Sequence, residues 1–454
     1  MDQPASFCFL SLRRRFHDAA PFTFNHQSKD FPMKRITFFL LTFVFCTTSV
    51  LFAADMSFFG KTDKNPLEYQ PGETMTFSVQ YLEDGQPVDG KNLSWRRTGD
   101  DGKVEEGTAV SSSTEPLKIE TSIDVPGFVR IQVFPMDDQG NRLCNEHDEA
   151  VQFNGGAGVL IDQIKGIPEP DDFDAFWDRQ KAILAQVPIK ASLTPVDSGD
   201  DNVLAYDVKV DCSGLAPVSG YLCMPKDAKE KSLPARVQYQ GYSVLPVSPN
   251  VGAGRSQICF TVNCHGMLNG QSAEYYQTLQ RTFLASYGFS PEQNKNPDSC
   301  YWCGMMMRAL RAVQYVKTLP EWDGVNLTTE GGSQGGMQCL TVAGLDSDVS
   351  HVNATIPWFC DVSGAEVSGR VDSWFMPSWV DGLGYFDTTN HAKRIKGSVF
   401  IYAGLGDYVC PPSGEMVLYN AIKSEKELLF RQGRTHGYEM PNGDGYTLKS
   451  PALE

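Results

Sequence analysis

Short stretches in which apolar and polar residues alternate fill the chain between residues 55 and 155. Alternation with a period of two is typical of β-strands, and closely spaced segments of this kind predict an antiparallel sandwich. Four segments follow the pattern, with turn-forming clusters such as Gly99 to Gly102 between them: Thr74 to Tyr81, Leu93 to Arg97, Leu117 to Ile123 and Phe128 to Phe134. We therefore predict an immunoglobulin-like domain over residues 55–155, connected to the rest of the chain by Val159 to Pro170.

Residues 156–454 have a different pattern, in which strand-like apolar runs alternate with longer helix-like segments. The pattern predicts helices at Asp172 to Gln186, Tyr301 to Thr318, Gly335 to Leu345 and Pro412 to Ile422. Such alternation favours an α/β domain with a mostly parallel sheet covered on both faces. A chain of 454 residues is also too long for one ordinary core, which agrees with two domains.

A serine within a glycine-rich turn is the clearest chemical signal of the chain. Gly331 to Gly336 reads GGSQGG, follows the strand-like run Val325 to Thr329, and leads into an apolar helix. A G-x-S-x-G motif between a strand and a helix is typical of a nucleophile elbow, which leaves the serine hydroxyl exposed. Ser333 is therefore the candidate nucleophile, and a plain glycine-rich turn is the alternative.

A serine nucleophile needs a base and an orienting acid, which α/β-hydrolases supply later in the chain in the order acid, then histidine. Asp407 follows the strand-like run Ser398 to Tyr402, and His436 follows Leu428 to Arg431. The other histidines lie before the expected mature start, in the first domain or before Asp407: His17, His26, His147, His265, His351 and His391. Three rival aspartates lack a place on a strand-end loop just upstream of His436: Asp361, Asp381 and Asp387. We predict Asp407 as the acid and His436 as the base.

Several further segments carry a family resemblance that begins near Pro170 and reaches the end of the chain. They are Asp172 to Trp177, Val208 to Pro225, Pro234 to Tyr242, Pro357 to Asp361, and Pro411 to Ser413 beside Asp407. With the elbow, they resemble the acetyl xylan esterase and cephalosporin C deacetylase family, carbohydrate esterase family seven of the α/β-hydrolase superfamily. The resemblance implies an α/β-hydrolase fold that the immunoglobulin-like domain precedes.

The resemblance also implies the remaining parts of an active site. The backbone N–H groups of Tyr242 and Gln334 would form the oxyanion hole, a role that backbone amides fill whatever their side chains. Trp358 and Phe359 could form an apolar wall for the acyl methyl group or stack on a sugar ring, although aromatics after a core strand are as often core residues. No metal or cofactor is expected. Family members tend to form ring-like oligomers, so a homo-oligomer is possible, with interfaces that the added domain could block or rebuild.

Three positions depart from the family's usual residues. Gln240 stands where the oxyanion loop usually has histidine, and Asn269 stands where an arginine is common. An asparagine cannot reproduce the five-donor fork of an arginine, so what that arginine anchors must be held differently. The family's Gly-His-Glu is here Thr435-His436-Gly437-Tyr438-Glu439, so the spacing of the glutamate differs.

Charge and the N-terminal segment bear on location and partners. With 39 basic and 55 acidic side chains, the net charge is −16, which disfavours nucleic acid or an anionic membrane as a partner. Met33 to Arg35, the apolar run Ile36 to Cys46 and the pair Ala53-Ala54 form the pattern of a secretory signal. We predict an upstream extension and signal peptide over residues 1–54, and an exported, periplasmic or secreted mature protein without a membrane span. A membrane anchor is the less favoured alternative, because the run is short.

Ten cysteines would remain in the mature chain, and an oxidising compartment would permit disulfides whose pairing the sequence does not give. Cys300 and Cys303 have the spacing of a redox pair or of half a zinc site. No second pair accompanies them, so metal or redox chemistry is disfavoured.

The sequence as a whole favours a serine esterase that removes acetyl groups from acetylated carbohydrates such as xylo-oligosaccharides, through a Ser-His-Asp triad and an acyl-enzyme. An exported peptidase or a general short-chain esterase of the same fold is an alternative. A catalytically silent carbohydrate-binding protein, with the first domain as its working part, is another. For the first domain itself, a packing or spacer role is preferred to docking on a carbohydrate or a surface.

Overall fold

The computed structural model describes residues 55–145 and 149–452. The predicted extension and signal peptide at residues 1–54 lie outside the described residues. Within the described part of the chain, no helix combines the length and the apolar character needed to cross a membrane.

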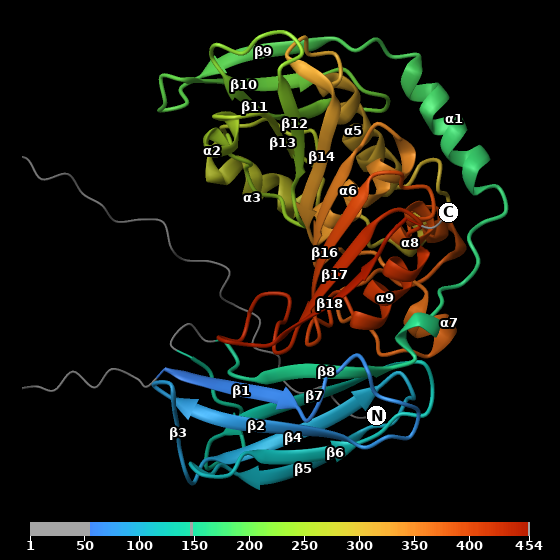
Figure 1. Ribbon diagram of the computed structural model, residues 1–454. Coiled ribbons are helices and arrows are strands. Elements are labelled where there is room, and N and C mark those ends of the chain that lie inside the picture. Colours follow the sequence, from blue (N-terminus) through green and yellow to red (C-terminus); the bar gives the residue numbers. More distant parts are fainter. Residues whose placement is uncertain (1–54, 146–148, 453–454) are drawn as a thin grey trace, which may run out of the picture.

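The first part of the chain forms two packed antiparallel sheets, as the alternating pattern predicted (Figure 1). One sheet contains β1 (Met56–Thr62), β2 (Met75–Glu83), β3 (Gln86–Pro87) and β6 (Leu117–Thr121). The other has the order β5-β4-β7-β8 and contains β4 (Asn92–Gly99), β5 (Glu105–Val110), β7 (Gly127–Met136) and β8 (Phe153–Val159). Side chains that alternate inward along β2 and β7 fill the core between the sheets. Because β8 pairs with β7 as far as Val159, the sandwich extends four residues past the boundary expected at residue 155.

The rest of the chain is built on a ten-stranded sheet of order β18-β17-β16-β15-β14-β12-β13-β11-β10-β9. The six strands from β17 to β13 run parallel, and antiparallel strands complete both edges. Their bounds are β9 (Ala191–Val196), β10 (Val203–Val210), β11 (Val218–Pro225), β12 (Leu233–Tyr239), β13 (Ile258–Asn263), β14 (Trp322–Gly332), β15 (His351–Thr355), β16 (Ser398–Gly404), β17 (Lys426–Arg431) and β18 (Gly445–Ser450). This is the mostly parallel sheet that the alternation predicted.

The four helices predicted from the sequence are present as α1, α5, α6 and α9, with ends shifted by a few residues at most. The helices are α1 (Phe173–Ala185), α2 (Val251–Gly254), α3 (Ala273–Arg281), α4 (Pro291–Asn294), α5 (Tyr301–Val316), α6 (Gln334–Leu345), α7 (Gly364–Ser368), α8 (Thr388–Ala392) and α9 (Pro412–Ala421), with 3₁₀ turns η1 (Ile161–Gln163) and η2 (Asp381–Tyr385). Contacts run from α1 to α5, α6, α8 and α9 in turn, so these helices form one layer beside the sheet (Figure 1). Crossover helices of this kind are what parallel strands require.

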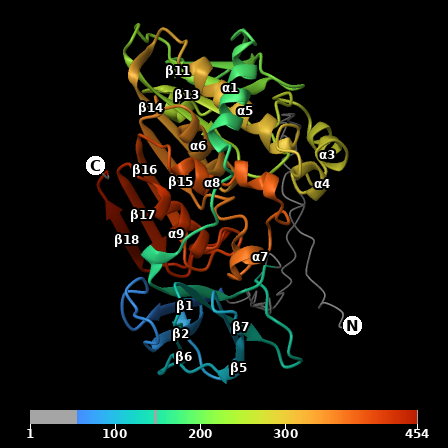
Figure 2. The same ribbon diagram turned by 90° about the vertical axis from the view of Figure 1, so that its right-hand side faces the viewer.

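The sandwich packs directly against the loops that follow β16 and β17 (Figures 1 and 2). Phe128 of β7 belongs to the core of the large sheet and lies 5.9 Å from the ring of Phe430 in β17. In return, Met440 belongs to the sandwich core. Gln432 exchanges two buried hydrogen bonds of 3.0 Å with the backbone of Gly156. Each part of the chain therefore contributes a side chain to the core of the other, and we call this contact region the joint core.

Candidate active site

Ser333 lies at the sharp turn between β14 and α6, with φ 54° and ψ −121°. A non-glycine residue rarely adopts such angles, and strain of this kind is typical of functional sites. Only glycine fits on either side of it, because a Cβ on Gly331 would lie 2.4 Å from the Gly335 backbone. A Cβ on Gly335 would lie 2.3 Å from the carbonyl of Tyr239. The flanking glycines therefore permit the elbow that the motif predicted.

His436 links the serine to a buried carboxylate. Its Nε2 lies 3.1 Å from Ser333 Oγ, and its Nδ1 lies 2.9 Å from Asp407 Oδ2. The other oxygen of Asp407 accepts hydrogen bonds from the N–H groups of Val409 and Cys410, at 2.9 and 3.0 Å. The Asp407 side chain has no exposed surface, whereas the His436 ring is 29% exposed. The order of these contacts is that of a nucleophile, a base and an orienting acid.

The three residues meet because they follow the ends of parallel strands in one part of the sheet, where only β15 separates β14 from β16 and β17. Ser333 follows β14, Asp407 follows β16 and His436 follows β17, so all three lie at the carboxyl edge of the sheet. The last two loops are also joined directly, since Gly406 N–H donates to the carbonyl of Arg434 at 3.0 Å. The geometry brings together the three side chains that the sequence selected.

The loop that carries Tyr242 is tied to the start of α6 by two glutamines. Gln338 Nε2 donates to the carbonyl of Gln240 at 2.9 Å, and Gln334 Nε2 donates to the carbonyl of Gly241 at 3.4 Å. The first N–H groups of a helix have no acceptor within that helix, so the amide of Gln334 is available for an oxyanion. Tyr242, whose N–H is the other expected donor, directly follows the two residues that these glutamines hold.

The departure at Gln240 is accommodated by the loop itself. Gln240 Nε2 donates to the carbonyl of Leu245 at 2.7 Å and to Ser243 Oγ at 3.1 Å. His265, one of the histidines set aside as a base, contacts the carbonyl of Ser243 at 2.7 Å through Nε2 and the hydroxyl of Tyr301 through Nδ1. Burial lowers the pKa of His265 to about 4, so it remains neutral near pH 7. A glutamine and a neutral histidine thus hold the loop.

Trp358 and Phe359 are both fully buried, so neither side chain offers a face to a sugar ring. Trp358 Nε1 donates to the carbonyl of Phe375 at 2.8 Å, and the Trp358 amide donates to the carbonyl of Ser333 at 3.0 Å. Stacking on a sugar by these two residues is therefore ruled out in this structure. They form the apolar floor behind the elbow.

Three further aromatic rings surround Tyr242: Tyr287, which is buried, and Phe289 and Phe375, which are partly exposed. Tyr287 stacks on Tyr242 at 4.3 Å between ring centroids, Phe375 lies at 5.0 Å and Phe289 at 5.8 Å. Sequence reasoning missed these rings because they come from irregular segments without periodicity. The runs Tyr287 to Phe289 and Trp374-Phe375 were the available signal.

Comparison with known proteins identifies the family. The family model for acetyl xylan esterase (AXE1) matches residues 162–370 and 378–444, more than half of the chain, and spans Ser333, Asp407 and His436. The chain belongs to this family. Acetyl xylan esterases are carboxylic ester hydrolases, so the family fixes the class of chemistry.

Similar proteins include an acetyl esterase and two acetyl xylan esterases. Acetyl esterase Axe7A of Xylanibacter ruminicola is 29% identical over 278 residues, which cover 59% of this chain and 63% of that protein. The chain thus spans less than two thirds of this curated relative. The structure of an acetyl xylan esterase from Paenibacillus sp. R4 matches with a TM-score of 0.51 and 26% identity, over 61% of this chain and 93% of that chain. Acetyl xylan esterase 1 from Thermoanaerobacterium sp. JW/SL YS485 matches with a TM-score of 0.50 and 24% identity, over 62% and 93%. These matches confirm the α/β-hydrolase fold.

Two other departures from the usual acetyl xylan esterase residues have structural solutions. Asn269 is buried and donates to Asp207 Oδ1 at 2.7 Å and to the carbonyl of Gly220 at 3.2 Å. Glu439 accepts from Arg431 Nε at 3.0 Å and from the hydroxyl of Tyr402 at 2.7 Å, and it pairs with Arg434. Asn269 therefore holds its turn against β10 and β11, and Glu439 braces the turn that follows His436.

Two members of the candidate triad lie beside a cysteine in a group that could hold a metal ion. Ligand atoms of Asp407, Cys410 and His436 lie within 4.8 Å of one another. Burial raises the pKa of the Cys410 thiol well above its usual range, which keeps it protonated. His436 Nδ1 is already engaged with Asp407. A metal binds the thiolate, so the arrangement fits an acid–base pair better than a ligand set. All ten cysteines from residue 144 to residue 410 are free thiols, the Cys300 and Cys303 pair included.

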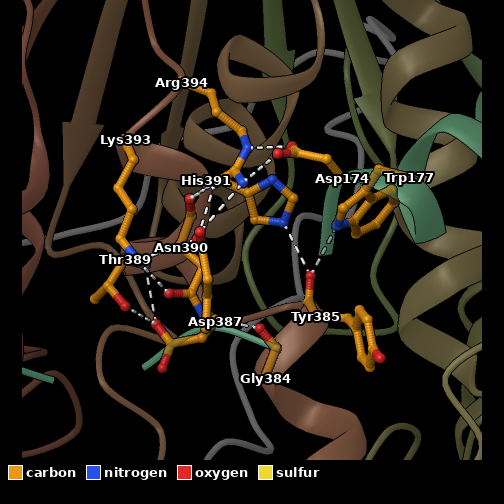
Figure 3. Close-up of polar contacts among 11 residues, drawn as sticks. Asp174, Trp177, Gly384, Tyr385, Asp387, Thr389, Asn390, His391, Lys393 and Arg394 are labelled. Atoms are coloured by element: carbon orange, nitrogen blue, oxygen red, sulfur yellow. Dashed lines mark hydrogen bonds and ion pairs between the residues drawn. The ribbon is translucent and has the colours of Figure 1, made fainter. Parts of the chain in front are cut away.

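The rejected His391 lies in a separate buried network (Figure 3). Its Nε2 lies 3.1 Å from the carbonyl of Tyr385, which also accepts from Trp177 Nε1 at 3.1 Å. Nearby Asp387 accepts from the amide and hydroxyl of Thr389 at 2.9 and 2.7 Å. Neither group contacts the candidate triad, so this network is structural.

The His391 network makes stability depend on pH. Burial lowers the pKa of His391 from 6.5 to about 3, so below pH 6.5 the unfolded chain binds a proton that the folded chain does not. Between these pH values the histidine costs about 1.4 kcal/mol of unfolding free energy per pH unit. Burial raises the pKa of Asp387 to about 6, which acts in the opposite direction below pH 6. Between pH 6.5 and 4, we expect the unfolding free energy of His391→Gln to fall less steeply with decreasing pH than that of the wild type. The difference in slope should reach about 1.4 kcal/mol per pH unit, the equivalent of one proton.

Urea unfolding at several pH values measures this slope in both proteins. Asp387 is present in both, so the difference between their slopes reports His391. Parallel curves would show that His391 is protonated in the folded protein.

Proposed function

We propose that this protein is a serine esterase that removes acetyl groups from acetylated carbohydrates such as xylo-oligosaccharides. The observation that carries the proposal is the hydrogen-bonded series from Ser333 through His436 to the buried Asp407. Membership of the acetyl xylan esterase family supports the ester as substrate. The relative Acetyl esterase Axe7A supports the acetyl group.

The proposed mechanism is a two-step acyl transfer. His436 Nε2 takes the Ser333 proton as Oγ attacks the acetyl carbonyl, while Asp407 orients the ring and stabilises the imidazolium. The amides of Tyr242 and Gln334 hold the oxyanion. His436 then returns the proton to the sugar oxygen as the alcohol leaves. Water, activated by the same histidine, attacks the acyl-enzyme and releases acetate.

The direct test is acetate release from acetylated xylo-oligosaccharides by the full mature chain, beside turnover of p-nitrophenyl acetate. Release from both supports a carbohydrate deacetylase. Turnover of p-nitrophenyl acetate alone leaves a general short-chain esterase, and turnover of neither leaves a silent binding protein. Export after signal cleavage belongs to the same proposal, because residues 33–54 have the pattern of a secretory signal. Fractionation of the producing cells tests it.

Activity on esters of different acyl-chain length should distinguish an acetyl-specific pocket from that of a general short-chain esterase. The rings of Trp358 and Phe375 pack against Tyr242, the candidate oxyanion donor, at 5.8 and 5.0 Å between ring centroids. Each methylene that does not fit a tight apolar pocket costs about 1 to 3 kcal/mol. We expect kcat/KM for p-nitrophenyl acetate to exceed that for the butyrate by about ten-fold or more. A preference for butyrate would argue against an acetyl-specific pocket.

A further inference from the structure

Residues 371–377 form a loop that the family model leaves out, although it matches the chain on both sides. Ser373 Oγ donates to the carbonyl of Val409 at 2.7 Å, and Trp374 N–H donates to the carbonyl of Tyr408 at 3.2 Å. Tyr408 and Val409 directly follow Asp407 in the chain. The loop is thereby fastened beside the candidate catalytic acid.

The sandwich holds the other end of this loop. Val371 N–H donates to Asp100 Oδ1 at 2.9 Å, and the second oxygen of Asp100 accepts from the amide of Phe128 at 2.8 Å. Asp100 lies in the turn that follows β4. One carboxylate thus connects the loop to the joint core, which gives the loop a fixed place at the edge of the site.

Aromatic rings continue from the oxyanion loop onto this segment. Phe375 lies 5.0 Å from Tyr242 and 5.6 Å from Trp358, and Trp374 lies 5.8 Å from Phe375. The rings therefore form an unbroken strip that begins at Tyr242, the candidate oxyanion donor, and ends at Trp374.

Trp374 is 68% exposed, the most exposed ring of this strip. Single exposed apolar residues are ordinary, but Trp374 is continuous, through Phe375, with the ring of Tyr242 on the candidate oxyanion loop. A tryptophan combines a large rigid apolar face with a polar N–H, which suits surfaces that are apolar on one side and wet on the other. A pyranose ring presents such a surface, with C–H groups on its faces and hydroxyls at its rim.

We propose that Trp374 is a sugar-binding platform at the rim of the site, which stacks on a sugar ring next to the acetylated one. The inference rests on the proposed function and names the part of that substrate which the loop recognises. A free acetate ester too small to reach the loop gains nothing from it. An acetylated oligosaccharide is held with one sugar on Trp374 and its ester near Ser333.

Direct binding tests the platform without turnover. In the full chain with Ser333→Ala, we would measure by calorimetry the Kd for an acetylated xylo-oligosaccharide. Adding Trp374→Ala should weaken binding by about ten-fold, the equivalent of one good aromatic contact. Adding Trp374→Phe, which keeps an aromatic face, should retain binding within about three-fold. Val325→Ala in the same background is the matched control, because Val325 is 67% exposed at the opposite end of β14 and should leave Kd unchanged.

An unchanged Kd in the Trp374→Ala protein would overturn the platform, and so would equal losses in Trp374→Phe and Trp374→Ala. Absence of measurable binding in Ser333→Ala itself would also overturn it. Acetate release by the wild-type chain from the same oligosaccharide is measured in parallel. If acetate is released but Trp374→Ala leaves Kd unchanged, the platform is wrong and the proposed function stands. If no acetate is released, the proposed substrate is wrong.

Discussion

Ser333→Ala and His436→Ala should each lower kcat/KM for p-nitrophenyl acetate by at least about a thousand-fold, because members of a triad act as a unit. The distances of 3.1 Å from Ser333 to His436 and 2.9 Å from His436 to Asp407 make proton transfer through His436 the expected route. Asp407→Asn should cost a similar amount or less, since the serine and the histidine would remain.

The measurement is steady-state turnover with each variant, with circular dichroism to verify folding. His351→Ala is a suitable control, because His351 is exposed at the start of β15, away from the carboxyl edge of the sheet. Turnover by Ser333→Ala equal to the wild type would remove the triad assignment.

Gly406→Ala should also lower activity strongly, although glycine takes no part in the chemistry. A Cβ at this position would lie 1.9 Å from the carbonyl of Asn154 in β8 and 3.1 Å from that of Arg434. Both neighbours are backbone, so the clash cannot be relieved by a side chain, and we expect Gly406 and the adjoining Asp407 to be displaced. A displacement of about 1 Å at a catalytic group can cost about a hundred-fold in rate. We expect that loss in kcat/KM, with about 1 to 3 kcal/mol of stability from overpacking.

Gly252→Ala is the matched control, because a Cβ on Gly252 in α2 has its nearest neighbour at 3.8 Å. Steady-state kinetics and urea unfolding of both variants separate a local loss of activity from global unfolding. Wild-type activity in Gly406→Ala would mean that the sandwich can shift without moving Asp407.

The arrangement of the site could be predicted where it depends on strand order. Parallel strands place their carboxyl ends at one edge, so residues after β14, β16 and β17 must converge there whatever the intervening helices contain. Ser333, Asp407 and His436 each follow one of these strands, and the structure brings their side chains within hydrogen-bonding distance. Their catalytic roles remain a prediction.

The exposure of the aromatic side chains near the site could not be predicted in the same way. Trp358 and Phe359 are as apolar as Phe375, and nothing in the pattern distinguishes a ring behind the elbow from one at the rim. The difference arises from tertiary contacts, such as the hydrogen bond from Trp358 Nε1 to the carbonyl of Phe375. Likewise, the boundary expected at residue 155 fell within β8, because Asn154 to Gly158 is rich in small residues and lacks the alternation typical of a strand.

The joint core over Phe128 and Met440 determines when the sandwich can complete its folding during synthesis. Residues 55–159 are synthesised long before their partners in the joint core, Phe430 and the turn from Gln432 to Met440. Until then the nascent sandwich carries an uncovered apolar patch on β7. Apolar surface that stays uncovered during synthesis invites aggregation, so a producing cell has reason to keep this chain chaperoned until its C-terminal strands arrive.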